Sequence, residues 1–298
     1  MAISPKLVQE LREKTGVGMM DCKRALEESG GNLDEAVKVL RKKGVATAEK
    51  KAMRAASEGL VFAHVAANAK VGVLIEVNCE TDFVAKTDDF QSLVAGLARQ
   101  VEEGAPSSPE ALLEQPFHVD TAQKVKDAIV AKVAQLGENI QVRRFDRYQT
   151  AEGTVAAYIH PGNKIGVLME TSCSDAGMAK SEEYSQIVKD LCMQVAASVP
   201  KFVRREQVTP EVLASEREIY RAQVLAQGKP ANIVDKIVEG KMNKFYEESC
   251  LLEQPFIKDP SVSVQKHLAS VAGDKIRVMR FTRYVLGEGL KPSGCDAP

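Results

Sequence analysis

The chain has 298 residues, a length that accommodates two or three domains, and its 44% apolar and 27% charged residues exclude wholesale disorder. With 40 Lys and Arg against 41 Asp and Glu, the formal charge is -1, so no global field attracts nucleic acid or an acidic membrane. No apolar run approaches the roughly 18–20 residues of a bilayer helix, and the first residues lack the apolar stretch of a secretion signal. We therefore expect a cytoplasmic protein whose partners are neither membrane nor nucleic acid.

The motif content does not point to chemistry on a bound substrate. The six cysteines are not spaced as zinc ligands, and the four histidines are isolated from one another. The sequence contains no Gly-x-Ser-x-Gly elbow, no Walker phosphate loop and no Gly-x-Gly-x-x-Gly turn. We therefore expect no metal, no cofactor, no direct nucleotide binding and no enzymatic activity.

Residues 1–45 show the pattern of three short helices in a small N-terminal domain. Ser4 and Pro5 suit a helix cap and a first turn, and Asn32 followed by Glu35 resembles a capping box. The third helix is predicted to close at Lys42, Lys43 and Gly44.

The loop between the first two helices carries Met19 and Met20 side by side. The two methionines either complete a small core or form a soft contact surface for a partner. Residues 46–57 are Ala-rich and basic, and they are predicted to form a linker helix whose charges face solvent.

The chain contains one module twice. Residues 58–80 align without a gap on residues 152–174, at an offset of 94, and each segment has two β-branched runs joined by a turn. A helical pattern of apolar residues follows at the same offset, beginning at Phe90 in the first copy and at Tyr184 in the second. Each copy is therefore predicted to form a hairpin followed by an amphipathic helix.

The duplication continues toward the end of each copy. The hexapeptide LLEQPF occurs at 112–117 and 251–256, and strand patterns follow at 139–148 and 275–284. Each module reads strand, strand, helix, helix, strand, which predicts an α+β fold with a small antiparallel sheet covered by helices on one face. We expect a core N-subdomain at 58–149 and a core C-subdomain at 150–286.

The second copy is longer, because the two LLEQPF segments are offset by 139 rather than 94. The additional residues, at about 205–249, read as two helices with a predicted seam of apolar residues that includes Ile219, Leu225, Ile233, Met242 and Phe245. This helical-hairpin (coiled-coil) insert either folds back on its domain or projects as an interaction arm, and it could also join two chains in a homodimer. Residues 287–298 read as a flexible tail.

The two copies disagree in one place. After the second strand the first copy reads Glu80-Thr81-Asp82-Phe83-Val84, where the second has Ser174-Asp175-Ala176-Gly177-Met178. A Phe in such a loop is either tucked under the next helix or exposed as a wedge, and the second copy folds without any aromatic residue there. The nearby carboxylates lack the spacing of a calcium loop, and Asp88 is predicted to cap the helix that begins at Phe90.

Two segments, TGVGMMDCKRAL at 15–26 and NCETDFVAK at 78–86, resemble the bacterial elongation factor Ts family. With the duplicated core and the hairpin insert, the likeness extends to about Gly289. The resemblance implies a ubiquitin-associated-like N-terminal domain, a two-subdomain core and a coiled-coil arm. It also implies a function in translation elongation, as guanine nucleotide exchange factor for the GTPase elongation factor Tu.

Carried over by position, the resemblance also implies which residues bind the partner. The loop that enters the GTPase domain near the Mg/phosphate site and promotes GDP release consists of Thr81, Asp82, Phe83 and Val84, with Phe83 as the wedge. A second contact with that domain is implied for Arg12, Met19 and Met20, and the second core half is implied to grip the partner's third domain.

Two positions depart from the family pattern. The family often has His where this chain has Gln194, and Pro292 and Gly294 stand where many members have a further C-terminal helix. The alternative function is a non-exchanging protein-binding scaffold or an RNA-replication cofactor, which would depend on the hairpin arm or on the basic linker.

Overall fold

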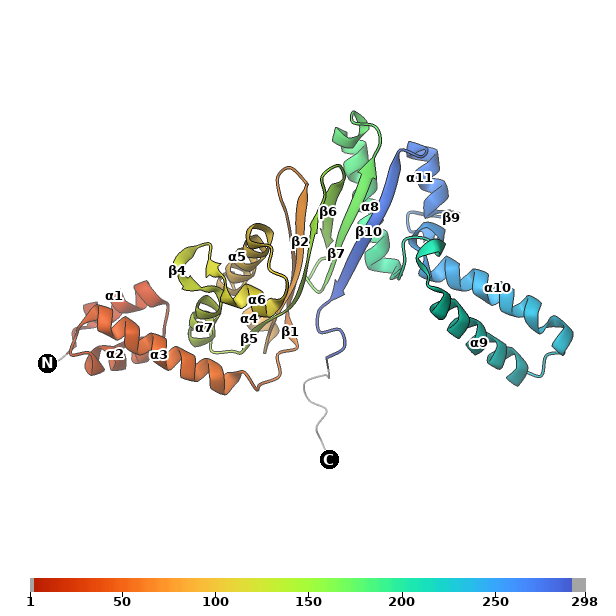
Figure 1. Cartoon of the computed structure of the whole chain (residues 1–298). Coiled ribbons are helices and arrows are strands. Elements are labelled where there is room, and N and C mark those ends of the chain that lie inside the picture. Colours follow the sequence, from red (N-terminus) through yellow and green to blue (C-terminus); the bar gives the residue numbers. More distant parts are fainter. Residues whose placement is uncertain (1–2, 291–298) are drawn as a thin grey trace.

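The computed structural model describes residues 3–290, apart from the side chain of Ala231 (Figure 1). The sequence predictions about Pro292 and Gly294 lie outside the described residues. The first three helices are α1 (Pro5–Thr15), α2 (Met19–Glu28) and α3 (Leu33–Lys51), and they enclose a small core of their own. Their starts follow the sequence prediction, because Ser4 accepts the N–H of Leu7 and Asn32 accepts the N–H of Glu35.

The third helix is longer than predicted. It does not end at Gly44 but continues to Lys51, through most of the predicted linker helix. Gly44 lies where α3 crosses α7 (Val125–Leu136), and a Cβ at this position would be 3.4 Å from the Cβ of Ala134. The glycine therefore permits a close helix crossing, and it does not stop the helix.

The first half of the core contains β1 (Glu58–Val65), β2 (Val71–Cys79), α4 (Asp82–Ala85), α5 (Asp88–Gly104), α6 (Pro109–Glu114), β3 (Pro116–Phe117), β4 (Asp120–Lys124), α7 and β5 (Ile140–Gln149). The second half contains β6 (Thr154–Ile159), β7 (Ile165–Cys173), the 3-10 helix η1 (Met178–Lys180), α8 (Glu182–Ser198), η2 (Arg205–Gln207), α9 (Pro210–Ala226), α10 (Ala231–Ser249), η3 (Leu251–Glu253), β8 (Pro255–Phe256), β9 (Asp259–Ser263), α11 (Val264–Ala272) and β10 (Ile276–Val285).

The α+β prediction is confirmed. Over residues 3–290, the larger sheets are two antiparallel ones with strand orders β1-β2-β5 and β10-β7-β6. Helices α5 and α7 cover one face of the first sheet, and α8 and α11 cover the equivalent face of the second. The sequence pattern did not predict the two-stranded ribbons β3-β4 and β8-β9 that follow the LLEQPF segments.

The remaining faces of the two sheets pack against each other, so each half completes the burial of the other. Six residues form this shared layer: Val61, Leu74, Tyr148, Val155, Leu168 and Tyr284. The contacts are reciprocal, because Val61 donates its N–H to the carbonyl of Asn163 while Val155 donates to the carbonyl of Ala69, both at 2.8 Å. The duplicated halves are therefore related by an approximate twofold axis through this layer.

Side chains repeat the same reciprocity. The guanidinium of Arg144 stacks 4.1 Å from the ring of Tyr284, and that of Arg280 stacks 4.0 Å from the ring of Tyr148. Each arginine therefore crosses from its own half to an aromatic ring of the other.

Two duplicated glycines permit this close packing, and substituting either should weaken it. A Cβ on Gly72 would lie 2.5 Å from Cγ1 of Val155, and one on Gly166 would lie 2.6 Å from Cγ1 of Val61. Because β-branched neighbours move little, we expect Gly72→Ala or Gly166→Ala to lower the free energy of unfolding by about 1–3 kcal/mol. Urea denaturation monitored by circular dichroism measures this loss.

Gly240→Ala is the matched control. Gly240 lies inside α10 with no atom within 4 Å of its ideal Cβ, so the substitution should stabilise the chain by about 0.5–1 kcal/mol. Equal behaviour of the Gly72 and Gly240 variants would contradict the tight sheet packing.

The duplicated acid of the central strand is buried in the first half only. The side chain of Glu76 is 0% exposed and accepts from Arg143 at 2.8 Å, from Arg144 at 2.6 Å and from the N–H of Gly287 at 2.8 Å. The Arg144 guanidinium also pairs with Glu288. The sequence pattern placed residues 287–290 in the flexible tail, but Gly287 and Glu288 are bound to the core.

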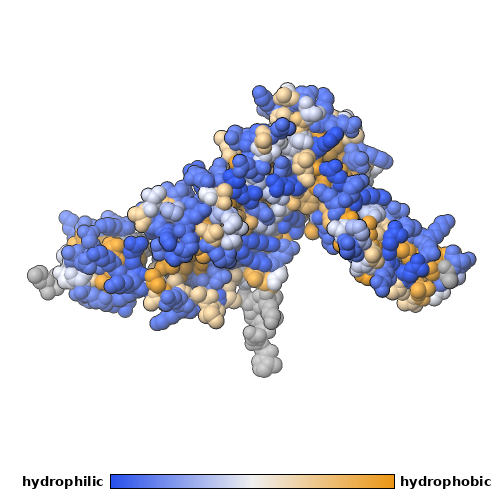
Figure 2. Space-filling view, viewed as in Figure 1, coloured by the Kyte–Doolittle hydropathy of each residue, from blue (hydrophilic) through white to orange (hydrophobic). Residues whose placement is uncertain are grey.

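Helices α9 and α10 form a hairpin that projects from the second half, on the side away from α1–α3 (Figure 1). Met242 and Phe245 are buried in the seam as predicted, but Ile219, Leu225 and Ile233 are exposed and Val224, Val234 and Val238 take their places. Figure 2 shows apolar surface toward the end of this hairpin. None of the helices in residues 3–290 has the length and hydropathy needed to span a bilayer.

Candidate functional site

The segment in which the two halves differ forms a single helical turn, α4, where the sequence pattern had suggested an open loop. Thr81 caps the turn, with its hydroxyl oxygen accepting the N–H of Val84 at 3.3 Å. Ala85 is buried, and Val84 packs against the core of the first half. The turn is thus anchored on its inner side.

The ring of Phe83 projects from this anchored turn into solvent. Its side chain is 79% exposed, whereas the neighbouring Val84 is partly buried and Ala85 is buried. Of the two alternatives left open by the sequence, a tucked ring and an exposed ring, the structure has the exposed one. Because burying a Phe is worth about 1.5–3 kcal/mol, the isolated fold leaves this free energy unused.

Asp82 lies beside Phe83 and carries a charge at neutral pH. The Lys86 ammonium, 2.6 Å from Oδ2 of Asp82, hydrogen-bonds to this carboxylate and lowers its pKa below the ordinary value. The side chain of Lys86 is 73% exposed and that of Asp82 is 45% exposed, so water screens this ion pair and it contributes little to folding stability. The turn thus presents an aromatic ring next to a carboxylate.

The equivalent turn of the second half is built differently. Asp175 stands where the first half has Thr81, and its Oδ1 accepts the N–H groups of Gly177 and Met178 at 3.0 Å. The Lys275 ammonium and these N–H groups lower the pKa of Asp175 to about 2. The 3-10 turn η1 that follows presents no aromatic side chain.

The following helix is capped by a residue other than the predicted one. The hydroxyl of Thr87 accepts the N–H of Phe90 at 3.3 Å, so Thr87 is the cap and Asp88 is the first residue of α5. The prediction for Asp88 is wrong, because the threonine one residue earlier has the extended backbone that a cap requires.

The other predicted binding residues lie on the N-terminal helices. Met19 and Met20 are 52% and 63% exposed at the start of α2, and Arg12 is exposed near the end of α1. The methionines therefore do not complete the core of this domain. Figure 1 shows α1 and α2 at one end of the molecule and α4 beside β1, so the two sets of residues form separate surfaces.

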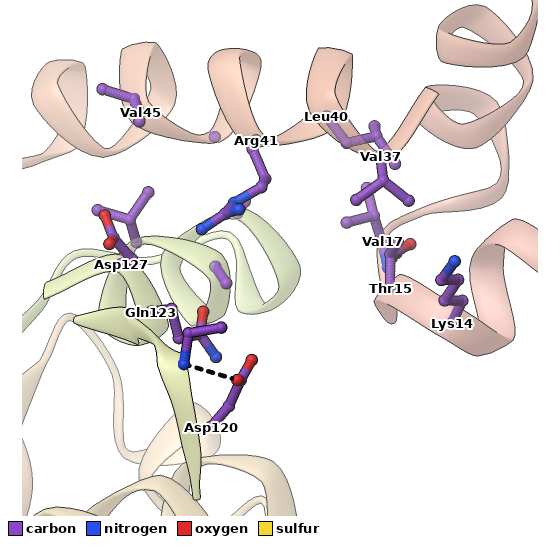
Figure 3. Close-up of a pocket in the computed structure, with 15 residues that line it drawn as sticks. Lys14, Thr15, Val17, Val37, Leu40, Arg41, Val45, Asp120, Gln123 and Asp127 are labelled. Carbon is purple, nitrogen blue, oxygen red and sulfur yellow. Dashed lines mark hydrogen bonds between the residues drawn. The ribbon is translucent and has the colours of Figure 1, made fainter. Parts of the chain in front are cut away.

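A cavity of about 360 Å³ lies beside the crossing of α3 and α7 and is lined by residues of the N-terminal helices, α7 and β4. Figure 3 shows Val17, Leu40 and Arg41 on one side of it, facing Asp120 and Asp127 on the other. None of the predicted site residues lines this cavity. Among residues 3–290, no cluster of three or more His, Cys, Asp or Glu side chains is arranged to hold a metal ion.

Gln194, the departure from the family pattern, is fully buried and serves its own half. Its amide nitrogen donates to Oε1 of Gln254 at 3.1 Å, and its Oε1 accepts the N–H of Ile257 at 2.8 Å. Gln100 makes the same two contacts in the first half, with Gln115 and the N–H of His118. Gln194 thus holds the ribbon that follows LLEQPF, a role that the offset of 94 between Gln100 and Gln194 could have revealed.

The sequence reasoning also missed a residue that contacts the Phe83-bearing turn. Glu138, in the connection between α7 and β5, accepts three hydrogen bonds from Glu80 and Thr81. The separation of 57 residues between Glu138 and Thr81 hides this contact from any local pattern.

Known proteins of one family match this chain. The family model described as elongation factor TS matches residues 80–288. Elongation factor Ts of Trichlorobacter lovleyi is 47% identical over 99% of this chain and 96% of the relative. Elongation factors Ts of Clostridium botulinum strain Alaska E43 (44% identical) and of Nostoc sp. (45% identical) each cover 97% of this chain and 94% of their own length. The chain therefore belongs to the elongation factor Ts family.

Proposed function

We propose that this chain is the guanine nucleotide exchange factor for elongation factor Tu in translation elongation. Membership of the family supports the general assignment. The observation that carries the mechanism is the Phe83 ring, which is exposed on an anchored turn in one half and has no counterpart in the other. The surface of α4 is the proposed contact with the GTPase domain.

The proposed exchange reaction makes and breaks no covalent bond. A GTPase holds GDP through Mg²⁺ and a cradle of backbone N–H groups, so displacing either weakens the site. An aromatic wedge can displace them if it binds the nucleotide-free partner better than the GDP-bound one. By reciprocity, if the chain weakens GDP binding a thousandfold, it binds the nucleotide-free partner about 4 kcal/mol more tightly than the GDP-bound one.

Each residue of the turn has a proposed part in this reaction. Phe83 is the wedge, and Asp82 places a negative charge beside it where phosphate and Mg²⁺ are held. Val84 fixes the turn to the core, and Thr81 caps the turn by accepting the N–H of Val84. No resident cofactor or metal is needed for this role.

The rest of the chain supplies the proposed grip on the partner. Arg12, Met19 and Met20 form a second contact with the GTPase domain, and the second core half binds the third domain of elongation factor Tu. We assign these roles to the N-terminal domain at 1–45 and to the core C-subdomain at 150–286. The hairpin at about 205–249 is an additional arm.

Shortening the arm separates exchange from the alternative of a scaffold or an RNA-replication cofactor. The segment before the hairpin lies against the end of α10, because Lys201 and Phe202 donate to the carbonyl of Ser249. In the shortened chain, a short linker replaces residues 209–247. We expect the shortened chain to keep at least a third of the stimulated GDP release, because the wedge lies on α4. Release of fluorescent GDP from purified elongation factor Tu measures this rate.

The same assay with Phe83→Ala completes the comparison. Loss of stimulation on removing the arm, together with full stimulation by Phe83→Ala, would replace exchange through α4 with the scaffold function. The chain alone, incubated with GTP, should release no phosphate.

A further inference from the structure

The two halves hold their equivalent turns by different means, although the connections behind them are equally long. Residues 137–139 lead from α7 to β5, and residues 273–275 lead from α11 to β10. In the second half Asp175 caps its own turn. In the first half the turn depends on a residue of the connection.

That residue is Glu138, whose two carboxylate oxygens both contact the start of α4. Oε1 accepts the Thr81 hydroxyl at 2.6 Å, while Oε2 accepts the N–H of Thr81 at 3.0 Å and the N–H of Glu80 at 3.1 Å. Hydrogen bonds to an ionised carboxylate are about twice as strong as neutral ones. The two residues before Asp82 are therefore held by three charge-assisted bonds.

The carboxylate also fixes the direction of the Thr81 hydroxyl. A hydroxyl has one hydrogen and two lone pairs, and by rotating it can direct either the hydrogen or a lone pair toward the helix. Because the hydrogen of Thr81 points to Glu138, a lone pair is left to accept the N–H of Val84. Glu138 thus orients the cap on which the whole turn, including Phe83, depends.

A second contact closes a ring around the same point. The N–H of Asn139 donates to Oε1 of Glu80 at 2.7 Å, while Glu80 donates its own N–H to Glu138. Asn139 is buried, and its amide donates to the carbonyl of Arg54 at 2.9 Å in the segment that follows α3. The backbone next to Glu138 is therefore fixed through Asn139, on one side by Glu80 and on the other by Arg54.

The second half shows that the fold does not need such a carboxylate. Asp274 occupies the position equivalent to Glu138 and is exposed. The Lys275 ammonium lies 2.9 Å from Oδ2 of Asp175, and the N–H of Ser174 donates to the Lys275 carbonyl. The module is therefore complete with a self-capped turn and no buttress from this position.

We propose that Glu138 is a positioning residue for nucleotide exchange, which sets the direction of Phe83 by holding Glu80 and Thr81 at the start of α4. This inference rests on the proposed function. Glu138 lies behind the turn and acts on the partner through Phe83, so its removal should change how well the wedge works once the complex has formed.

Glu138→Ala should lower the maximal rate of stimulated GDP release about tenfold, and the concentration for half-maximal stimulation should change less than twofold. Glu138→Gln keeps one acceptor and should lose about threefold. Asp274→Ala, at the equivalent position of the second half, is the matched control and should leave the maximal rate unchanged. Stopped-flow release of fluorescent GDP from elongation factor Tu over a range of chain concentrations gives both quantities.

A double variant tests whether Glu138 acts through the ring. In the Phe83→Ala background, Glu138→Ala should slow release by less than a further factor of two. Amide hydrogen exchange of the full chain, read by NMR, should show faster exchange at Thr81 and Val84 in Glu138→Ala and unchanged exchange in Asp274→Ala. These two readouts distinguish positioning from a general loss of stability.

The outcomes separate this inference from the proposed function. If Phe83→Ala slows release and Glu138→Ala does not, or if the two effects multiply fully, the positioning role is refuted and the wedge remains. If Phe83→Ala leaves release unchanged, the wedge is refuted, whatever Glu138→Ala does. Slow release in both single variants without a further loss in the double variant supports both.

Discussion

Replacing Phe83 by Ala should slow the GDP release that this chain stimulates by about a hundredfold, with little effect on its folding. The ring is 79% exposed in the free chain, so its removal costs the fold little. In the proposed complex the ring is buried against the partner, and burying a Phe is worth up to about 3 kcal/mol. A loss of about 2.7 kcal/mol at the rate-limiting step corresponds to a hundredfold.

The measurement is single-turnover release of fluorescent GDP from elongation factor Tu at a saturating concentration of the chain. Phe83→Leu retains apolar volume and should recover part of the rate. Val119→Ala removes another exposed apolar side chain of the same half and serves as the control, with no expected change. If Phe83→Ala weakened binding to elongation factor Tu but left the maximal rate of GDP release unchanged, Phe83 would be a simple contact residue and not the wedge.

Glu76→Gln should lower the free energy of unfolding by about 3 kcal/mol, the largest stability effect that we expect. Glu76 is 0% exposed and pairs with two arginines, Arg143 and Arg144, whose side chains are themselves mostly buried. Removing one partner of a buried ion pair leaves the other charges unmatched, at a cost of about 3–5 kcal/mol. We place the effect at the lower end, because both arginines retain some contact with water.

Glu170→Gln is the internal control for this experiment. Glu170 is the duplicate of Glu76, but its side chain is 14% exposed and its ion pair is with a single arginine, Arg280, at 2.7 Å. We expect a loss of about 1 kcal/mol in urea denaturation. A Glu76 variant no less stable than the Glu170 variant would show that the cluster with Arg143, Arg144 and Gly287 contributes no additional stability.

The fold was predictable to the extent that the chain repeats itself. Because β2 and β7, and likewise α5 and α8, recur at the same offset, a pattern seen twice could be trusted as sheet and helix. The end of α3 could not be predicted locally. Whether Gly44 stops a helix or permits a helix crossing depends on Ala134, ninety residues later in the chain.

The candidate site was predictable in part for the same reason. Comparing the halves isolated residues 80–84, because the second copy folds without a Phe at the position of Phe83. The hydrogen-bonding role of Glu138 could not be found in this way, since Glu and Asp at equivalent positions look alike and only the structure shows that Asp274 is exposed. The exposed Ile219, Leu225 and Ile233 show a similar limit, because helix phase alone did not fix which face of the hairpin is buried.

The packing of the two sheets against each other also determines how rigid the core of this molecule is. Because Gly72 packs against Val155 and Gly166 against Val61 across one shared interior, the halves cannot pivot about each other without opening a densely packed layer. The surfaces that the two halves present are consequently held at a fixed distance from each other. Under the proposed function, a rigid chain of this kind leaves the change of shape on binding to the partner.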